Sequence, residues 1–220
     1  MLKDKLINDI EGIPLKMDLI KDNVLPDPDL YAYYNDIRNR TLYLDSEIER
    51  ETLIPLTKMI LAWNKEDADN KIPIEQRKPI KIMIYSYGGE IDATIHFIDV
   101  CLLSKTPIYT YNLGVAMSGG FYILLAGSKR FALKNSQALC HQGSGGFEGS
   151  AEDVKLHTEQ YRKILDKLAE YTLNRTKIPK TLYNRKKKSE WFVNGSEQVE
   201  LGIVDKMIDD IDEILWWGWS

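Results

Sequence analysis

The chain has 220 residues, of which 44% are hydrophobic and 28% charged, and this composition predicts one globular domain with a substantial core. It excludes a mainly disordered or low-complexity protein, because only 14 glycines and 8 prolines are present. The 33 acidic and 29 basic residues give a formal charge of −4, so composition favours neither nucleic acid nor anionic lipid as a partner.

Hydrophobic segments of the chain are too short to span a membrane. The longest uninterrupted apolar run, Phe121 to Ala126, falls far short of the roughly 20 residues that a bilayer requires. The first 25 residues mix charged and apolar side chains and contain no secretory signal. We therefore expect a cytoplasmic protein without an integral membrane segment, in which Cys101 and Cys140 are reduced core residues.

The N-terminal third predicts an extension followed by the start of a domain. Residues 1–36 have weak periodicity and three prolines, which predicts an axial or partly ordered arm before a domain at 37–220. Residues 41–44 have strand composition, and a helix is expected from near Thr52, with apolar residues at spacings of three and four. Residues 64–78 are polar and are predicted to form a loop.

Strands and helices then alternate along the chain. The predicted order is a strand at 80–85, a turn at Gly88 and Gly89, a helix over 91–102 and a strand at 108–113. Gly114 opens a predicted small-residue turn, followed by an apolar helix at 118–126 and a strand at 130–133. This alternation predicts an α/β fold with a largely parallel sheet.

The C-terminal third predicts a short strand, a glycine-rich loop and a long helix. The strand at 137–140 ends at His141, and Ser150 is the expected cap of a helix with a heptad stripe over about 151–174. Such a helix is predicted to project and pack on a neighbour. Residues 195–210 indicate a short helix, a turn and a strand, and three tryptophans near the C-terminus suggest a contact surface or packing on the domain.

Ser118 and His141 are the strongest candidates for chemistry. Ser118 precedes two glycines at the start of a predicted helix, where free N–H groups and the helix dipole can stabilise an oxyanion. A simple helix cap is the alternative for Ser118. His141 ends a strand beside glycines, and a buried, hydrogen-bonded core histidine is its alternative. His96 and His157 are expected to serve packing or surface roles.

Six segments in chain order resemble the proteolytic subunit of the Clp protease, a family of self-compartmentalising serine peptidases with a crotonase-like fold. They are Ser86-Tyr-Gly-Gly89 where the family has Ser-Pro-Gly-Gly, the segment 114–120, Cys140-His141-Gln142, the loop 143–149, the long helix, and the segment 200–205. The resemblance implies repeated ββα units with a projecting handle helix.

The resemblance also implies a catalytic site. Ser118 would be the nucleophile and His141 the general base, with amides around Gly88 or Gly89 and Gly119 as the oxyanion hole. The bare cleft edge, which includes Gln142, Gly143 and Gly145, would pair with an extended peptide by β-augmentation. A flexible loop is the alternative interpretation of these glycines.

The third member of the triad is not evident from the sequence. Counting back from Trp191-Phe192 places Lys186 where the family has an aspartate, and a lysine accepts no hydrogen bond from an imidazole N–H. Three interpretations remain open: Asn184 orients His141, Glu190 supplies the charge, or the site is weak until assembly or a partner completes it. A Ser-Lys dyad through Lys186 is a fourth.

The resemblance implies an assembly as well: two stacked rings, each of about seven subunits, interlocked by the handle helices, with a separate AAA+ unfoldase that uses ATP to feed unfolded protein. This chain contains no phosphate-binding Gly-Lys-Ser/Thr loop, and neither a cofactor nor a metal is implied for it. One rival interpretation is a non-catalytic subunit that assembles with an active paralogue. A second is an acyl-CoA enzyme, for which only Glu90 is adjacent to the predicted oxyanion glycines.

Overall fold

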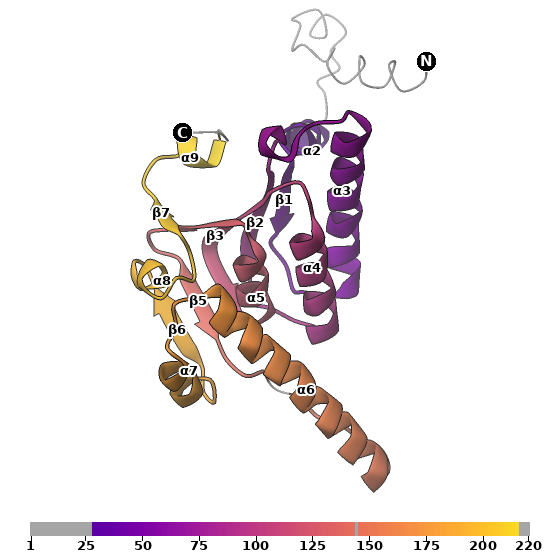
Figure 1. Cartoon of the computed structure of the whole chain (residues 1–220), viewed down its shortest axis with the longest axis vertical. Coiled ribbons are helices and arrows are strands. Elements are labelled where there is room, and N and C mark those ends of the chain that lie inside the picture. The colour runs from indigo at the N-terminus through magenta and orange to yellow at the C-terminus, as the bar shows by residue number, and fades with distance from the viewer. Residues whose placement is uncertain (1–27, 144, 216–220) are drawn as a thin grey trace, which may run out of the picture. The chain divides into compact units, whose positions relative to one another are not determined.

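The computed structural model describes residues 28–143 and 145–215 (Figure 1). The chain divides into two units, residues 1–41 and 42–220. In the first unit the structure describes helix α2 (Pro28–Arg38), which starts at a proline, a residue well suited to the first turn of a helix. The remainder of the predicted N-terminal arm and the terminal tryptophans at 216, 217 and 219 lie outside the described residues, so those predictions stay untested.

A seven-stranded, mostly parallel sheet is the centre of the described part of the second unit. Strands run in the order β1-β2-β3-β4-β7, while β5 pairs with β3 and β6 pairs with β5. The β5–β6 pair is antiparallel, whereas β3 runs parallel to β2, β4 and β5. The strands are β1 (Thr41–Leu44), β2 (Ile80–Ser86), β3 (Ile108–Met117), β4 (Lys129–Leu133), β5 (Gln137–Cys140), β6 (Trp191–Asn194) and β7 (Lys206–Ile208).

Helices alternate with these strands, as the sequence pattern predicts. The α-helices are α3 (Arg50–Asp69), α4 (Ile91–Leu103), α5 (Gly119–Ala126), α6 (Ala151–Arg175), α7 (Lys180–Lys186), α8 (Glu197–Glu200) and α9 (Asp212–Leu215), and η2 (Ile74–Gln76) is a 3₁₀-helix. Helix α5 is buried along its whole length and contacts β2, β3 and β5. The α/β fold with a largely parallel sheet is therefore confirmed.

Strand β3 is longer than the sequence pattern predicts, and the turn expected at Gly114 is wrong. The strand continues through Gly114 because its second half, Val115–Met117, pairs with β5, while its first half pairs with β4. Gly114 packs closely against β2, since a Cβ there would lie 2.5 Å from the ring of Tyr85 and would displace it. The extra length carries the residue after the strand, Ser118, to the edge of β5.

Helix α3 also extends further than predicted, so the loop expected at 64–78 is wrong over its first six residues. Two of the polar residues there, Asn64 and Asp67, make tertiary hydrogen bonds. The Asn64 side chain donates to Ser104 Oγ at 2.8 Å and accepts from the amides of Lys105 and Thr106. Asp67 is fully buried and accepts from Thr106 Oγ1 at 2.7 Å. The polarity of Asn64 and Asp67 therefore reflects hydrogen bonding to the α4–β3 connection.

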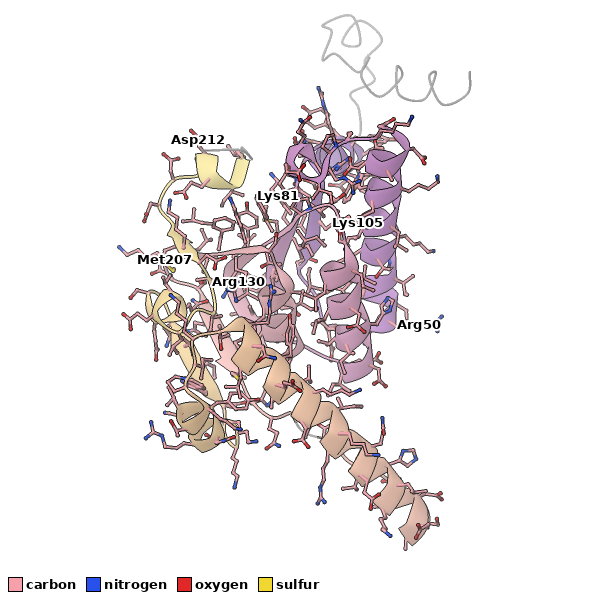
Figure 2. All side chains as sticks on the ribbon, viewed as in Figure 1. Arg50, Lys81, Lys105, Arg130, Met207 and Asp212 are labelled. Atoms are coloured by element: carbon pink, nitrogen blue, oxygen red, sulfur yellow. The ribbon has the colours of Figure 1, made fainter. Side chains whose placement is uncertain are left out.

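Helix α6 matches the predicted handle within one residue at its end. Ser150 caps it by accepting from the Asp153 amide at 3.2 Å. At the other end Arg175 donates to the carbonyls of Leu125 and Gly127, and Arg130, labelled in Figure 2, donates to the Arg175 carbonyl at 2.7 Å. Helix α6 is thus held at its C-terminal end, and its N-terminal half projects from the sheet (Figure 1).

Burial agrees with the predicted behaviour of the apolar residues. Cys101 and Cys140 are both buried and free, as expected, and burial raises the pKa of the Cys140 thiol to about 12. Across the described residues, no helix combines the length and the apolar character needed to cross a membrane.

Candidate active site

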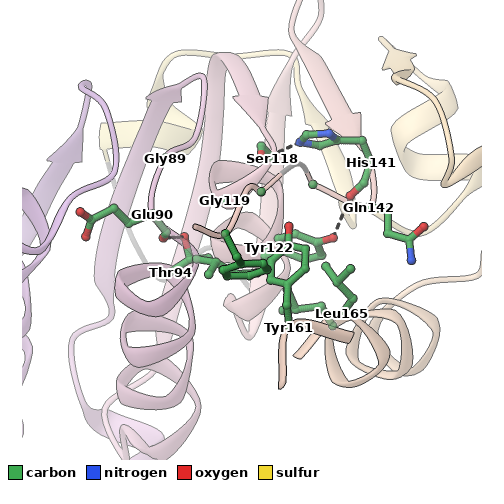
Figure 3. A pocket seen from close by; sticks show the side chains of 15 residues that line it. Gly89, Glu90, Thr94, Ser118, Gly119, Tyr122, His141, Gln142, Tyr161 and Leu165 are labelled. Carbon is green, nitrogen blue, oxygen red and sulfur yellow. Dashed lines mark hydrogen bonds between the residues drawn. The ribbon is translucent and has the colours of Figure 1, made fainter. Parts of the chain in front are cut away.

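Two neighbouring parallel strands bring Ser118 and His141 together. Met117 at the end of β3 lies in register with Leu139 near the end of β5, and the Ser118 amide donates to the Leu139 carbonyl at 3.1 Å. His141 follows Cys140, the last residue of β5. His141 Nε2 lies 2.7 Å from Ser118 Oγ, within hydrogen-bond distance (Figure 3). The two residues singled out from the sequence therefore meet at the carboxyl ends of adjacent strands.

The backbone at Ser118 differs from that of an ordinary helix cap. Its φ of 51° and ψ of −116° are a conformation that non-glycine residues rarely adopt, and such strain tends to gather at functional sites. The Ser118 side chain makes no capping hydrogen bond to α5, and its hydroxyl contacts His141 instead. The structure therefore opposes the simple helix cap considered above. The Ser118 carbonyl, in contrast, does accept the first helical amides, those of Phe121 and Tyr122.

His141 is fixed by its own backbone as well as by Ser118. Tyr122, on α5, donates its hydroxyl to the His141 carbonyl at 3.1 Å, and Tyr171, on α6, donates to the Tyr122 carbonyl at 3.2 Å. Burial raises the pKa of Tyr122, so its hydroxyl stays protonated and can act as this donor. His141 is half-buried, and its ring is exposed to the same cavity as Ser118.

Two glycine amides beside Ser118 are suitable oxyanion donors. Gly119 is the first residue of α5, where an N–H has no partner within the helix. The isolated bridge between Ile48 and Gly89 uses the Gly88 carbonyl and the Glu90 amide, which leaves the Gly89 amide outside its hydrogen bonds. A Cβ on Gly119 would lie only 3.6 Å from the Gly89 nitrogen. Gly89, Ser118 and Gly119 line one cavity, which is the arrangement that two oxyanion donors beside a nucleophile require.

The Gly88 amide is placed differently. It donates to Ser86 Oγ at 3.2 Å, and a Cβ on Gly88 would lie 2.7 Å from the Ser118 Cβ. Gly88 therefore packs directly behind the serine, and of the two glycines named from the sequence Gly89 has the available N–H.

A cavity of about 370 Å³ opens in front of the Ser118–His141 pair. Its apolar side includes Tyr122, Tyr161 and Leu165, which Figure 3 shows gathered on one side of the pair. Gln142, Gly143 and Gly145 also line it, as expected for a substrate-contacting edge, and Gly143 has a φ of 82°. The Gln142 amide is already engaged, since it donates to the Lys187 carbonyl at 2.9 Å.

No described residue hydrogen-bonds to His141 Nδ1 in this structure, so the third member is not fixed by a direct contact. Asn184 and Lys186 lie exposed on α7, and neither is among the described residues that line the cavities at His141. Glu190 does line a cavity with His141. In the antiparallel β5–β6 pair Cys140 lies opposite Trp191 at the end of the ladder, so His141 and Glu190 both lie just beyond the same end of this pair.

The sequence did not reveal the cross-strand relation between His141 and Glu190 because it depends on the register of β5 and β6. The only available signal was the position of Glu190 immediately before a strand-like Trp-Phe-Val run. The contacts of Tyr122 with His141 and of Ser86 with Gly88 were also missed, since each joins residues from different elements or across a turn.

The structure is therefore that of an α/β protein in which a serine hydroxyl contacts a histidine ring at the carboxyl ends of two parallel strands. The model of the Clp protease family matches residues 27–210, and the chain therefore belongs to the Clp protease family. It is similar to the ATP-dependent Clp protease proteolytic subunit of Deinococcus radiodurans, with 27% identity over 183 residues, which are 82% of this chain and 86% of that protein. The family and fold predicted from the six segments are confirmed, and with them a peptidase at the level of the family.

Proposed function

We propose that this chain is a serine endopeptidase subunit that hydrolyses peptide bonds through an acyl-enzyme on Ser118. The observation that carries the proposal is the 2.7 Å contact between Ser118 Oγ and His141 Nε2, beside the amides of Gly89 and Gly119. A serine hydroxyl becomes an effective nucleophile when an adjacent imidazole accepts its proton.

In the proposed reaction Ser118 Oγ attacks the substrate carbonyl carbon while His141 Nε2 accepts the hydroxyl proton. The carbonyl oxygen becomes an oxyanion that receives hydrogen bonds from the N–H groups of Gly89 and Gly119. His141 then protonates the leaving amine, the peptide bond breaks and the acyl group remains on Ser118. Water, deprotonated by His141, hydrolyses the ester and restores the serine.

Glu190 is our candidate for the residue that orients His141 and stabilises its charged form. Its support is the register of β5 and β6 and the cavity that it shares with His141. A glutamate is one methylene longer than an aspartate, and a change of its rotamer can bring a carboxylate oxygen toward Nδ1. Catalytic hydrogen bonds are often long in free enzymes and shorten when substrate binds. Asn184 and Lys186 remain weaker candidates, because the register provides no such relation for them.

A non-catalytic role within an assembly is the second candidate function. The observation in its favour is that, in the described part of the chain, His141 Nδ1 has no hydrogen-bond acceptor. In that case the Ser118–His141 pair would be retained without turnover, and peptide hydrolysis would come from an active paralogue.

We further propose that the chain forms stacked rings, with α6 packing between them, and that a separate AAA+ unfoldase supplies unfolded protein using ATP. The support is membership of the Clp protease family and the exposed surface of α6, on which Leu156 is 55% exposed. Cytoplasmic localisation remains part of the same proposal, and no cofactor is assigned to this chain.

Hydrolysis of fluorogenic peptides by the assembled protein tests the proposed activity. The wild type is expected to turn over, while Ser118→Ala and His141→Ala lose activity by at least about a thousandfold. Ser196→Ala, in an exposed serine before α8 that lines neither cavity at His141, is the matched control and is expected to retain full activity. Absence of turnover by the wild type in a verified ring would favour the non-catalytic role.

A further inference from the structure

A buried serine lies behind the glycine pair of the site. Ser86, the last residue of β2, is 1% exposed, and its hydroxyl donates to the Ser46 carbonyl at 2.6 Å. The same oxygen accepts the Gly88 amide at 3.2 Å. The described residues that line the cleft with Ser118 do not include Ser86, so it is placed to act on the cleft only through its neighbours.

The glycine pair needs such external restraint. Gly88 has a φ of 104° and Gly89 a φ of 153°, and glycine loses more conformational freedom on ordering than any other residue. Two backbone hydrogen bonds hold the pair from one side, from the Ile48 amide to the Gly88 carbonyl at 2.8 Å and from the Glu90 amide to the Ile48 carbonyl at 2.7 Å. The first of these bonds holds the Gly88–Gly89 peptide, which contains the Gly89 N–H, and neither bond holds the preceding Tyr87–Gly88 peptide, whose N–H donates to the Ser86 hydroxyl.

The same hydroxyl joins two segments that are far apart in the sequence. Its donor bond goes to the segment that also carries Ile48, and its acceptor bond holds the amide of Gly88. Helix α5 closes the arrangement from another direction, because a Cβ on Gly120 would lie 3.0 Å from the Ser86 carbonyl oxygen. The Ser86 hydroxyl holds the Tyr87–Gly88 peptide and the Ile48 amide holds the Gly88–Gly89 peptide, and these two neighbouring restraints together determine the direction of the Gly89 N–H.

We propose that Ser86 is a positioning residue that holds the Gly88–Gly89 segment so that the Gly89 amide points toward the oxyanion formed at Ser118. The catalytic part of this inference rests on the proposed function. It predicts that the Ser86 hydroxyl contributes to stabilisation of the transition state and little to substrate binding, since it touches no substrate atom. Positioning of an amide donor matters because such donors act only within a short distance and a narrow angle of the developing charge.

Ser86→Ala tests the inference, with Ser128→Ala as the matched control. Ser128 also donates its hydroxyl to a backbone carbonyl, that of Ile108 at 2.8 Å, but lies away from the cleft. In the ring-assembled protein we expect Ser86→Ala to lower kcat about tenfold and to change KM less than about twofold. The expected loss in kcat is smaller than the roughly 10²–10³-fold loss caused by removing a whole oxyanion donor, because the Gly89 amide is still present. Affinity for a peptide boronate, which mimics the tetrahedral state, should fall by a similar factor, and Ser128→Ala should change neither.

Amide hydrogen exchange over residues 84–92 gives a readout that does not require turnover. Exchange at Gly88 and Gly89 is expected to accelerate in Ser86→Ala and to stay at the wild-type rate in Ser128→Ala. Unchanged exchange overturns the inference, whether or not the wild type is active. Faster exchange with unchanged kcat and boronate affinity overturns the catalytic part. If the wild type neither hydrolyses peptides nor binds the boronate, the proposed function is overturned, and with it the catalytic role of Ser86. The hydrogen-exchange rates then still decide whether Ser86 holds the glycine pair.

Discussion

Replacing Glu190 with glutamine is the substitution that best separates the possible third members of the site. It keeps the size of the side chain and removes the charge that we expect to face His141. Loss of the orienting aspartate in serine proteases costs about 10⁴ in kcat. Glu190 is exposed, so solvent weakens its interaction with the imidazolium, and we expect a smaller loss of about 10²-fold, equivalent to about 2.7 kcal/mol.

The assay is steady-state hydrolysis of a fluorogenic peptide by the assembled ring. Glu197→Gln, an exposed glutamate on α8, is the control for a general effect of lost charge and is expected to keep wild-type kcat. Asn184→Ala and Lys186→Ala should each stay within about twofold, because neither residue is among the described residues that line the cavities at His141. Since Glu190 is exposed, its substitution should change the free energy of unfolding by no more than about 0.5 kcal/mol. Wild-type kcat for Glu190→Gln, or a large loss in Asn184→Ala, would refute the assignment.

Three further predictions concern steric fit at Gly89, burial of Cys140 and hydrogen bonding by Asn64. Gly89→Ala should destabilise the fold by at least about 2 kcal/mol in chemical denaturation and abolish hydrolysis, because its Cβ would lie 2.1 Å from the Ile48 carbonyl oxygen. Gly146→Ala is the control: its Cβ would have no neighbour within 4 Å, so it should change neither stability nor hydrolysis. Cys140, whose pKa is raised to about 12, stays a neutral thiol at pH 8 and should resist iodoacetamide until the protein unfolds; rapid labelling of the native protein would contradict its burial. Asn64→Ala should cost about 2 kcal/mol of unfolding free energy because it leaves two amides without their acceptor, and a loss under about 0.5 kcal/mol would contradict this.

Local patterns in the sequence were sufficient for the alternation of strands and helices, whereas the assignment of Ser118 and His141 as a pair depended on the resemblance to the Clp protease family. The local signals were limited to two glycines after Ser118 at the start of a predicted helix and to the place of His141 at the end of a short strand. Parallel neighbouring strands end at the same edge of a sheet, so the placement of the two residues together follows once β3 and β5 pair.

Features that depend on tertiary contacts were not predictable in this way. The polar residues after Trp63 resembled a loop because their hydrogen bonds to residues 104–106 are not visible in the sequence. Gly114 resembled a turn because the Tyr85 ring that packs against it comes from another strand. Glu190 remains one of several alternatives, and its support, the position of both residues at one end of the β5–β6 pair and a cavity shared with His141, depends on tertiary structure.

Reaction of the assembled protein with a fluorophosphonate, followed by intact mass and peptide mapping, tests the serine nucleophile most directly. We predict one adduct per chain, located on Ser118, and labelling that slows at least about a hundredfold in His141→Ala because the hydroxyl proton then has no acceptor. An unmodified wild-type ring, or an adduct that forms equally fast without His141, would contradict the account.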